Sequence, residues 1–193
     1  MAFVASTTLR RWLKIAGPGL WIGCLMVGAT LVMGTTVNGA SRWLVIGPIQ
    51  VQPSELVKPF VVLQAASLFA HWKRNALDQK LLWLASFATL VLLILKQPNL
   101  STAALIGLLI WLMAFSAGLP LLQLFGTALA GGFLGISSIL INEYQRIRVI
   151  SFLNPWNDPQ GDGYQLIQSL LAIGSGGIFG QGFGLSAQKL QYL

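Results

Sequence analysis

Long apolar segments dominate this chain and limit its possible folds more than any other feature. A helix needs about 20 apolar residues to cross the hydrocarbon core of a bilayer. Five segments reach or come close to that length: 17–36, 53–72, 80–96, 100–118 and 119–141. With 55% hydrophobic and only 9% charged residues, the composition also lies outside the usual range of soluble domains. We therefore expect an all-α, polytopic membrane protein in which each of these segments forms a transmembrane helix.

The basic residues predict how these helices are oriented. The chain has 12 Lys and Arg against 5 Asp and Glu, for a net charge of +7. One cluster lies before the first apolar segment and consists of Arg10, Arg11 and Lys14. The other lies between the second and third segments and consists of His71, Lys73, Arg74 and Lys80. Because Lys and Arg concentrate in cytoplasmic loops, both clusters are expected on the cytoplasmic side, and the positive charge does not imply nucleic acid binding. Residues 37–52, residues 96–99 and the region after residue 141 are then expected on the outer face.

The region after residue 141 has a different composition. Residues 142–164 are polar and rich in Pro and Gly, whereas residues 165–184 are apolar but contain many glycines. The apolar part is too short to span a bilayer, so we expect a short helix that lies at the interface, re-enters the membrane or packs on the bundle. We divide the chain into a helix bundle at 1–141 and a large extracytoplasmic loop region at 142–193, within one domain.

Two ionisable residues lie near the start of the second apolar segment, in the sequence QPSELVK. Pro53 and Ser54 are typical of a helix start. Glu55 and Lys58 are three positions apart and therefore share one face of a helix. Charges inside a membrane span are costly unless they are paired or face a wet cavity. This pair is therefore either a structural ion pair or part of the lining of a polar cavity that opens outward.

Arginines on the predicted outer face are candidates for anion binding. Arg42 lies in the loop before the second apolar segment, and Arg146 and Arg148 follow the fifth. Clustered guanidinium groups bind diphosphates or carboxylates through bidentate hydrogen bonds. The alternative is that these arginines only contact lipid headgroups.

The polar stretch NPWNDPQGDGYQ, residues 154–165, contains two carboxylates. Asp158 and Asp162 are four positions apart, but Pro159, Gly161 and Gly163 make a helix improbable, so the two need not face one another. Asp158 lies in the more rigid, proline-flanked part of the loop. A carboxylate held in this way suits a general base, although Asp-Pro is also a common turn starter.

Single residues exclude several kinds of site. Cys24 is the only cysteine, so an intramolecular disulfide and a cysteine-based zinc site are excluded, and we interpret it as a packing residue. His71 is the only histidine and is expected on the cytoplasmic side, so no histidine metal site or Ser-His-Asp triad is expected on the outer face. The glycine cluster at 174–184 lacks the spacing and the preceding strand of a phosphate-binding loop.

Four segments of the chain resemble, in the same order, the SEDS family (FtsW/RodA) of bacterial membrane proteins: VNGASRWLVIGPIQVQPSELVKPF, LKQPNLSTAAL, EYQRIRVISFLNPWNDPQGDGYQLIQSLLAIGSGG and FGLSAQKLQYL. The NPW run resembles the division branch of the family more than the rod-shape branch. This resemblance implies a multi-pass protein of the bacterial cytoplasmic membrane, at the division septum. Five helices here match the third to seventh of the family, so the chain is expected to lack helices at both ends.

The resemblance also implies an activity and partners. Family members are peptidoglycan glycosyltransferases that polymerise lipid II, an undecaprenyl-diphosphate-linked disaccharide peptide, on the outer face. They work with a class B penicillin-binding protein and other divisome proteins. We expect membrane lipid but no nucleic acid among the partners. Three residues depart from the family pattern: Asn99 stands where Asp is usual, Ser101 stands where Gly is usual, and Asp162 stands where a small residue is usual.

The resemblance assigns roles to particular residues. Asp158 matches the essential aspartate of the family and is the expected catalytic base, whereas Asp162 is assigned no role. The expected substrate-binding residues are Arg42, Ser54, Glu55, Lys58, Arg148, Gln165 and Gln168. In the implied reaction an acceptor sugar hydroxyl attacks the anomeric carbon of the donor, with inversion. The departing diphosphate needs positive charge, from Arg148, Arg42, Lys58 or a divalent cation such as Mg²⁺ or Mn²⁺, whose ligands are unknown.

Two other functions remain open at this point. A flippase or transporter for a lipid-linked precursor would also use a polar cavity around Glu55 and Lys58. A non-catalytic scaffold could hold partner proteins at the septum. The position of Asp158 in an outer loop favours the glycosyltransferase, because a transporter is expected to keep its ionisable groups near the midplane of the membrane.

Overall fold

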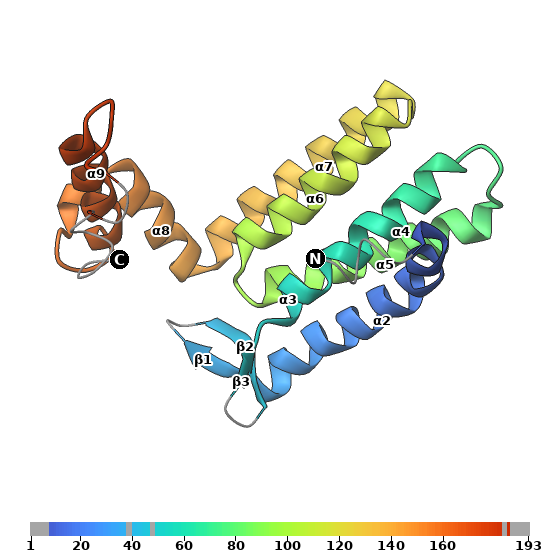
Figure 1. Ribbon diagram of the computed structural model, residues 1–193, viewed down its shortest axis with the longest axis horizontal. Coiled ribbons are helices and arrows are strands. Elements are labelled where there is room, and N and C mark those ends of the chain that lie inside the picture. Colours follow the sequence, from blue (N-terminus) through green and yellow to red (C-terminus); the bar gives the residue numbers. More distant parts are fainter. Residues whose placement is uncertain (1–7, 38–39, 47–48, 183–184, 186–193) are drawn as a thin grey trace. The chain divides into compact units, whose positions relative to one another are not determined.

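The computed structural model describes residues 8–37, 40–46, 49–182 and 185 (Figure 1). The chain divides into two compact units, Met1–Ser138 and Ile139–Leu193, and the division falls within the last turn of α7. The elements of the first unit are α2 (Leu9–Met33), β1 (Thr35–Val37), β2 (Ala40–Ile46), β3 (Ile49–Val51), α3 (Pro53–Leu56), α4 (Lys58–Ala70), α5 (Leu77–Lys96), α6 (Leu100–Ser116) and α7 (Leu121–Ile141). The second unit contains α8 (Glu143–Leu153), the 3-10 helix η1 (Pro155–Asn157) and α9 (Tyr164–Gly176).

Most of the described chain is helical, which confirms the predicted all-α class of a polytopic membrane protein. Among the described residues, three helices are long and apolar enough to cross a bilayer, namely α2, α5 and α7. The apolar helix α6 has 17 residues and α4 has 13, so both are shorter than a full span.

Two helices differ most from their predicted bounds, and the others differ by two or three residues at an end. The first begins at Leu9 rather than at residue 17, because the basic residues before the apolar run are good helix formers whose long side chains reach back to water. The second is divided at Val57 into α3 and α4. Pro59 is the physical reason, since it has no N–H to bond the carbonyl of Glu55 and its ring crowds that turn.

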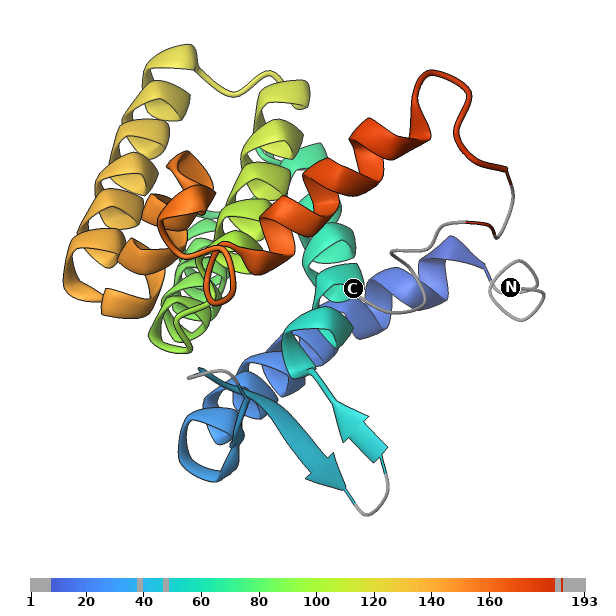
Figure 2. The same cartoon turned by 90° about the vertical axis from the view of Figure 1, so that its left-hand side faces the viewer.

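The segment between α2 and α3 was expected to be a loop, but it contains a three-stranded antiparallel sheet in the order β1-β2-β3 (Figures 1 and 2). Thr35 pairs with Trp43, and Val45 pairs with Gln50. The sequence TTVNGASRWLVIGPIQV explains the strands. Its β-branched and aromatic residues favour extended structure, and the pairs Asn-Gly and Gly-Pro are turn formers placed between the strands.

The core of the first unit lies where α2, α4, α5 and α6 pack together. Its members include fully buried aliphatic residues from all four helices, among them Leu20, Val61, Leu90 and Ile106. Gly23 brings α2 close to the start of α4, because a Cβ added there would overlap the side chain of Val57. Small residues at helix contacts allow this close approach, which is the main source of packing energy between helices in a membrane.

A buried polar link ties the end of α5 to α2. Gln97 is 1% exposed, and its Nε2 donates hydrogen bonds to the carbonyl of Val27, at 3.1 Å, and to the hydroxyl of Thr30. The Thr30 hydroxyl in turn donates to the Val27 carbonyl at 2.7 Å. This arrangement satisfies polar groups that would otherwise be costly inside an apolar bundle.

Replacing Gln97 by leucine is expected to lower the free energy of unfolding by about 1 to 3 kcal/mol, because Thr30 loses its cross-helix partner in a buried site. The measurement is the thermal unfolding of the purified protein in detergent. Gln79→Leu, at an exposed position of α5, is the matched control and should leave the midpoint unchanged. Equal midpoints for wild type and Gln97→Leu would show that the link does not contribute to stability.

Candidate functional site

The second unit presents Asp158 on a short loop between η1 and α9. Pro155 begins η1 and is buried, so it anchors the start of the loop. Helix α8 ends at Leu153, and the backbone N–H of Asn154 caps it by bonding the carbonyl of Ile150 at 2.9 Å. The loop therefore leaves from two ordered elements, and Asp158 itself is exposed to solvent.

The carboxylate of Asp158 is held by two backbone N–H groups. Oδ1 accepts from Gly161 at 3.0 Å, and Oδ2 accepts from Asp162 at 3.2 Å. These bonds fix the side chain in one orientation and make Asp158 the first residue of a turn. The turn-forming role that the sequence suggested is therefore present. It is compatible with catalysis, because each carboxylate oxygen has a second lone pair for another donor.

Two glycines that the sequence analysis treated only as helix breakers are needed for this geometry. A Cβ added at Gly161 would overlap Oδ2 of Asp158, and one added at Gly163 would overlap the carbonyl oxygen of Pro155. The backbone N–H of Gly163 also bonds the Asp158 carbonyl at 3.0 Å. The spacing Asp-x-x-Gly-x-Gly in the sequence is the signal that could have revealed them, because only glycine leaves room for a carboxylate or carbonyl at such close range.

The other predicted residues of the second unit lie on its two helices. Arg148 is exposed on α8 and makes no ion pair among the residues described there, whereas Arg146 pairs weakly with Glu143 at 3.9 Å. Gln165 and Gln168 are in the first two turns of α9, three positions apart and hence on one face. The unit thus contains a fixed carboxylate, a guanidinium group and two amides.

The predicted residues of the first unit gather at the break between α3 and α4. Lys58 Nζ lies 2.7 Å from Glu55 Oε1, so the two charges form an ion pair, as one of the two interpretations of this motif proposed. Ser54 is buried, and its hydroxyl accepts a hydrogen bond from Gln52 Nε2 at 3.2 Å. Arg42 belongs to β2, but its side chain lies outside the described part of the structure.

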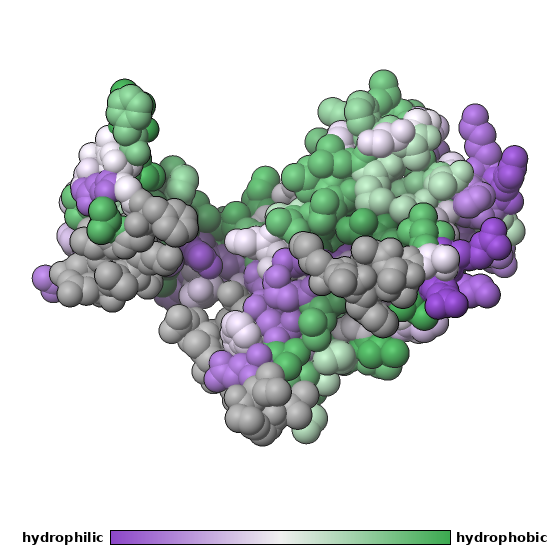
Figure 3. Space-filling model, viewed as in Figure 1, coloured by the Kyte–Doolittle hydropathy of each residue, from purple (hydrophilic) through white to green (hydrophobic). Residues whose placement is uncertain are grey.

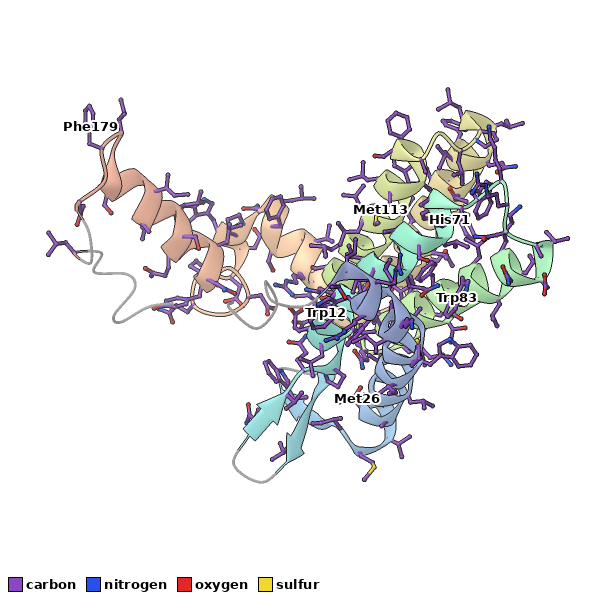
Figure 4. The ribbon with its side chains drawn as sticks, turned by 45° about the vertical axis from the view of Figure 1, so that its right-hand side comes forward. Trp12, Met26, His71, Trp83, Met113 and Phe179 are labelled. Carbon is purple, nitrogen blue, oxygen red and sulfur yellow. The ribbon has the colours of Figure 1, made fainter. Side chains whose placement is uncertain are left out.

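The apolar stretch 165–184 was expected to form a short helix at an interface, re-entering the membrane or packed on the bundle, and α9 occupies most of it. Within its unit the tip of this segment is uncovered, because Ile178 and Phe179 are 96% and 99% exposed. Figure 4 shows Phe179 at the end of the loop, pointing away from it. The residues from 186 onward, and Phe183 and Gly184, lie outside the described part.

An apolar cavity of about 590 Å³ opens in the first unit, among α4, α5, α6 and α7. Trp72, Trp111 and Leu134 contribute to its lining, together with Gly107 and Gly135, where a Cβ would meet nothing within 4 Å. Figure 3 shows a largely hydrophobic surface over α6 and α7. A cavity with this lining suits an aliphatic chain rather than a polar ligand.

The described residues do not form a protein-built metal site. No group of three or more His, Cys, Asp or Glu side chains gathers anywhere in residues 8–182 as far as they are described. No reaction step below passes through a metal ion.

Apolar spanning helices, a buried polar link within them and a carboxylate-bearing loop unit define a multi-pass helical membrane protein with a candidate catalytic loop. The family profile for the FtsW, RodA and SpoVE group, described as "Cell cycle protein", matches residues 1–193. The chain belongs to this family, which is the one that its motifs resemble.

Several relatives are similar over most of the chain. A probable peptidoglycan glycosyltransferase FtsW of Synechocystis sp. is 56% identical over 161 residues, which is 83% of this chain and 41% of the relative. Another from Shewanella sediminis is 41% identical over 199 residues, covering 100% of this chain and 48% of the relative. The chain thus spans about half the length of the curated relatives that it matches.

Two solved structures share the fold. A chain from a structure that concerns the coordination of polymerization and crosslinking by a peptidoglycan synthase complex is 34% identical, with a TM-score of 0.68, and the match covers 91% of this chain and 53% of that one. The rod shape determining protein RodA of Thermus thermophilus is 25% identical, with a TM-score of 0.53, and the match covers 83% and 67% of the two chains.

Proposed function

We propose that this chain belongs to a membrane glycosyltransferase that polymerises lipid II into the glycan strands of peptidoglycan during bacterial cell division. The observation that carries the proposal is the Asp158 carboxylate, which two backbone N–H groups hold in one orientation on an exposed turn. The names of the relatives support the reaction class, since they are probable peptidoglycan glycosyltransferases.

In the proposed reaction Asp158 is the general base. The 4-hydroxyl of the acceptor sugar donates a hydrogen bond to a free lone pair of the carboxylate and attacks the anomeric carbon of the donor. The new C–O bond forms as the bond from that carbon to the diphosphate breaks, and the hydroxyl proton passes to Asp158. A single displacement of this kind inverts the configuration at the anomeric carbon. Proton transfer to a positioned base contributes about 10² to 10⁴ in rate.

The leaving diphosphate carries negative charge that the protein must stabilise. Arg148 is the first candidate, because its guanidinium group has no partner among the described residues of its unit. Lys58 is already paired with Glu55, so it would act as a member of that pair. We assign the isoprenoid tail of the substrate to the apolar cavity among α4 to α7, whose lining matches an aliphatic chain.

The proposal extends to partners and location. A structural neighbour comes from a peptidoglycan synthase complex in which polymerization and crosslinking are coordinated. We propose that the full-length protein works in the cytoplasmic membrane at the septum with a class B penicillin-binding protein, which crosslinks the product.

The test of the function is polymerisation of purified lipid II by the full-length protein together with its crosslinking partner, followed by gel separation of the glycan strands. Strands should form only when the protein is present. Liposomes loaded with fluorescent lipid II test the flippase alternative at the same time. Translocation without strand synthesis would overturn the proposed glycosyltransferase function. If the protein shows neither translocation nor strand synthesis, the scaffold is the function that remains.

A variant of Gly161 tests the turn that holds the base. Gly161→Ala is expected to lower the polymerisation rate by about tenfold to 100-fold, since the added methyl overlaps Asp158 Oδ2 and must turn the carboxylate away from its position. Gly174→Ala, in α9 where a Cβ meets nothing within 4 Å, is the matched control and should keep the wild-type rate. A normal rate for Gly161→Ala would show that the observed orientation of Asp158 is not the catalytic one.

A further inference from the structure

The first unit has a further groove, which is lined by none of the residues assigned to the reaction. It has a volume of about 420 Å³ and is formed where α2 meets α4 and α5. Its lining combines one amide, one ammonium group and two indole rings, from Gln64, Lys14, Trp21 and Trp83. Figure 4 labels Trp83 on α5, and the distance of 2.7 Å from its ring to a Cβ added at Gly17 shows how closely this ring packs on α2.

Gln64 is the residue in this groove that needs an explanation. It lies in the middle of α4 and is only 7% exposed, yet its side chain makes no hydrogen bond within the part of the chain that the structure describes. A Cβ added at Gly17 would lie 3.6 Å from Gln64 Oε1, so the amide rests against the glycine backbone of α2. The Gln64 amide lines the groove, so its N–H groups are available to a bound ligand with a hydrogen-bond acceptor.

The charge at the mouth of the groove indicates what kind of ligand fits. Lys14 is exposed and makes no ion pair among the described residues, and Arg10 and Arg11 precede it in the same helix. Lys14 is three residues before Gly17, so its backbone lies about 4.5 Å nearer the start of α2 than the glycine against which the Gln64 amide rests. Tryptophan side chains beside such a polar step are typical of the zone where headgroups meet acyl chains.

We propose that this groove binds a glycerophospholipid with an anionic headgroup. The phosphate pairs with the Lys14 ammonium, an ester carbonyl one layer deeper accepts a hydrogen bond from Gln64 Nε2, and an acyl chain lies along Trp21 and Trp83. Lys14, Gln64 and the two tryptophans follow one another along the groove in the same order as phosphate, ester and acyl chain follow one another in the lipid. This inference does not depend on the glycosyltransferase activity, because none of these residues was assigned to the reaction.

Native mass spectrometry of the purified protein, titrated with phosphatidylglycerol or phosphatidylcholine of the same acyl chains, tests the site. The wild type should bind one phosphatidylglycerol more tightly than phosphatidylcholine. Gln64→Leu, which keeps the volume and removes the amide, should weaken that binding about fivefold, as expected for one buried hydrogen bond. Lys14→Gln should weaken it about as much and should remove the preference for phosphatidylglycerol. Inorganic phosphate in millimolar excess should not displace the lipid.

Matched controls separate a built site from general surface attraction. Lys73→Gln removes a cation outside the groove, and Gln79→Leu removes an exposed amide, so both should bind phosphatidylglycerol as the wild type does. Thermal unfolding of every variant without added lipid checks that the bundle is intact. The proposal is overturned if the two lipids bind equally, if Lys73→Gln weakens binding as much as Lys14→Gln, or if Gln64→Leu has the wild-type affinity in a folded protein.

Discussion

Exchange of Asp158 for asparagine in the full-length protein is expected to reduce lipid II polymerisation at least 100-fold while the protein still folds and reaches the membrane. Asparagine has the same shape, and its side-chain oxygen can still accept the hydrogen bond from the Gly161 N–H. It loses the second acceptor, which in the wild type takes the hydrogen bond from the Asp162 N–H. It also loses the ability to take a proton from the acceptor sugar hydroxyl, which is the step that we assign to Asp158. The measurement is the initial rate of strand synthesis by purified protein with its crosslinking partner.

Asp162→Asn is the matched control, since it makes the same chemical change four residues away. Only the backbone N–H of Asp162 contacts Asp158, so its own carboxylate is not needed for the turn. This variant should retain a rate within about twofold of the wild type, as surface changes away from a site usually do. A wild-type rate for Asp158→Asn, or an equal loss in both variants, would contradict the assignment of Asp158 as the base.

Gly23→Leu is expected to have the largest effect on stability. The first atom of the new side chain would overlap the side chain of Val57, which is fully buried and, as a β-branched residue, has little rotamer freedom to move aside. Overpacking of this kind costs about 1 to 3 kcal/mol, and here it also separates α2 from α4. The loss should appear as a lower midpoint of thermal unfolding in detergent, and as a lower yield of folded protein.

Gly28→Leu provides the comparison within the same helix. A Cβ at Gly28 meets nothing within 4 Å, so the change adds the same side chain and the same helix propensity without a clash. Its midpoint should equal or exceed that of the wild type. If Gly23→Leu and Gly28→Leu have the same midpoint of thermal unfolding, the close contact between α2 and α4 does not limit the stability of the protein.

The helical class followed from the sequence, because a run of apolar residues long enough to cross a bilayer has few other solutions. Where the structure differs from the prediction, a local preference of the sequence was either outweighed or overlooked. Pro59 divides the second helix because it lacks a donor, a reason that was already visible in the sequence. The strands β1 to β3 formed in a segment that was treated as a loop, although its β-branched residues and turn pairs were also visible.

Part of the candidate site could likewise be predicted from the sequence, and part of it could not. Asp158 could be singled out from its proline-flanked loop and from the motifs around it, and its role stays a prediction until the variant is measured. Its orientation could not be inferred, because that depends on two backbone N–H groups whose directions are set by how the turn closes. The close contacts that require glycine at positions 161 and 163 could not be inferred from composition either, because they depend on distances between atoms in the folded turn.

By itself the sequence determined that the protein is a helical membrane protein of a particular family, because hydrophobic length and motif order are properties of consecutive residues. Only the tertiary structure decided which distant residues meet. It placed Gln97 beside Thr30, Gly23 against Val57, and the unpaired amide of Gln64 next to Lys14 and two tryptophans. These contacts join separate helices, and helix packing depends on the fit of side chains across the interface rather than on any local pattern.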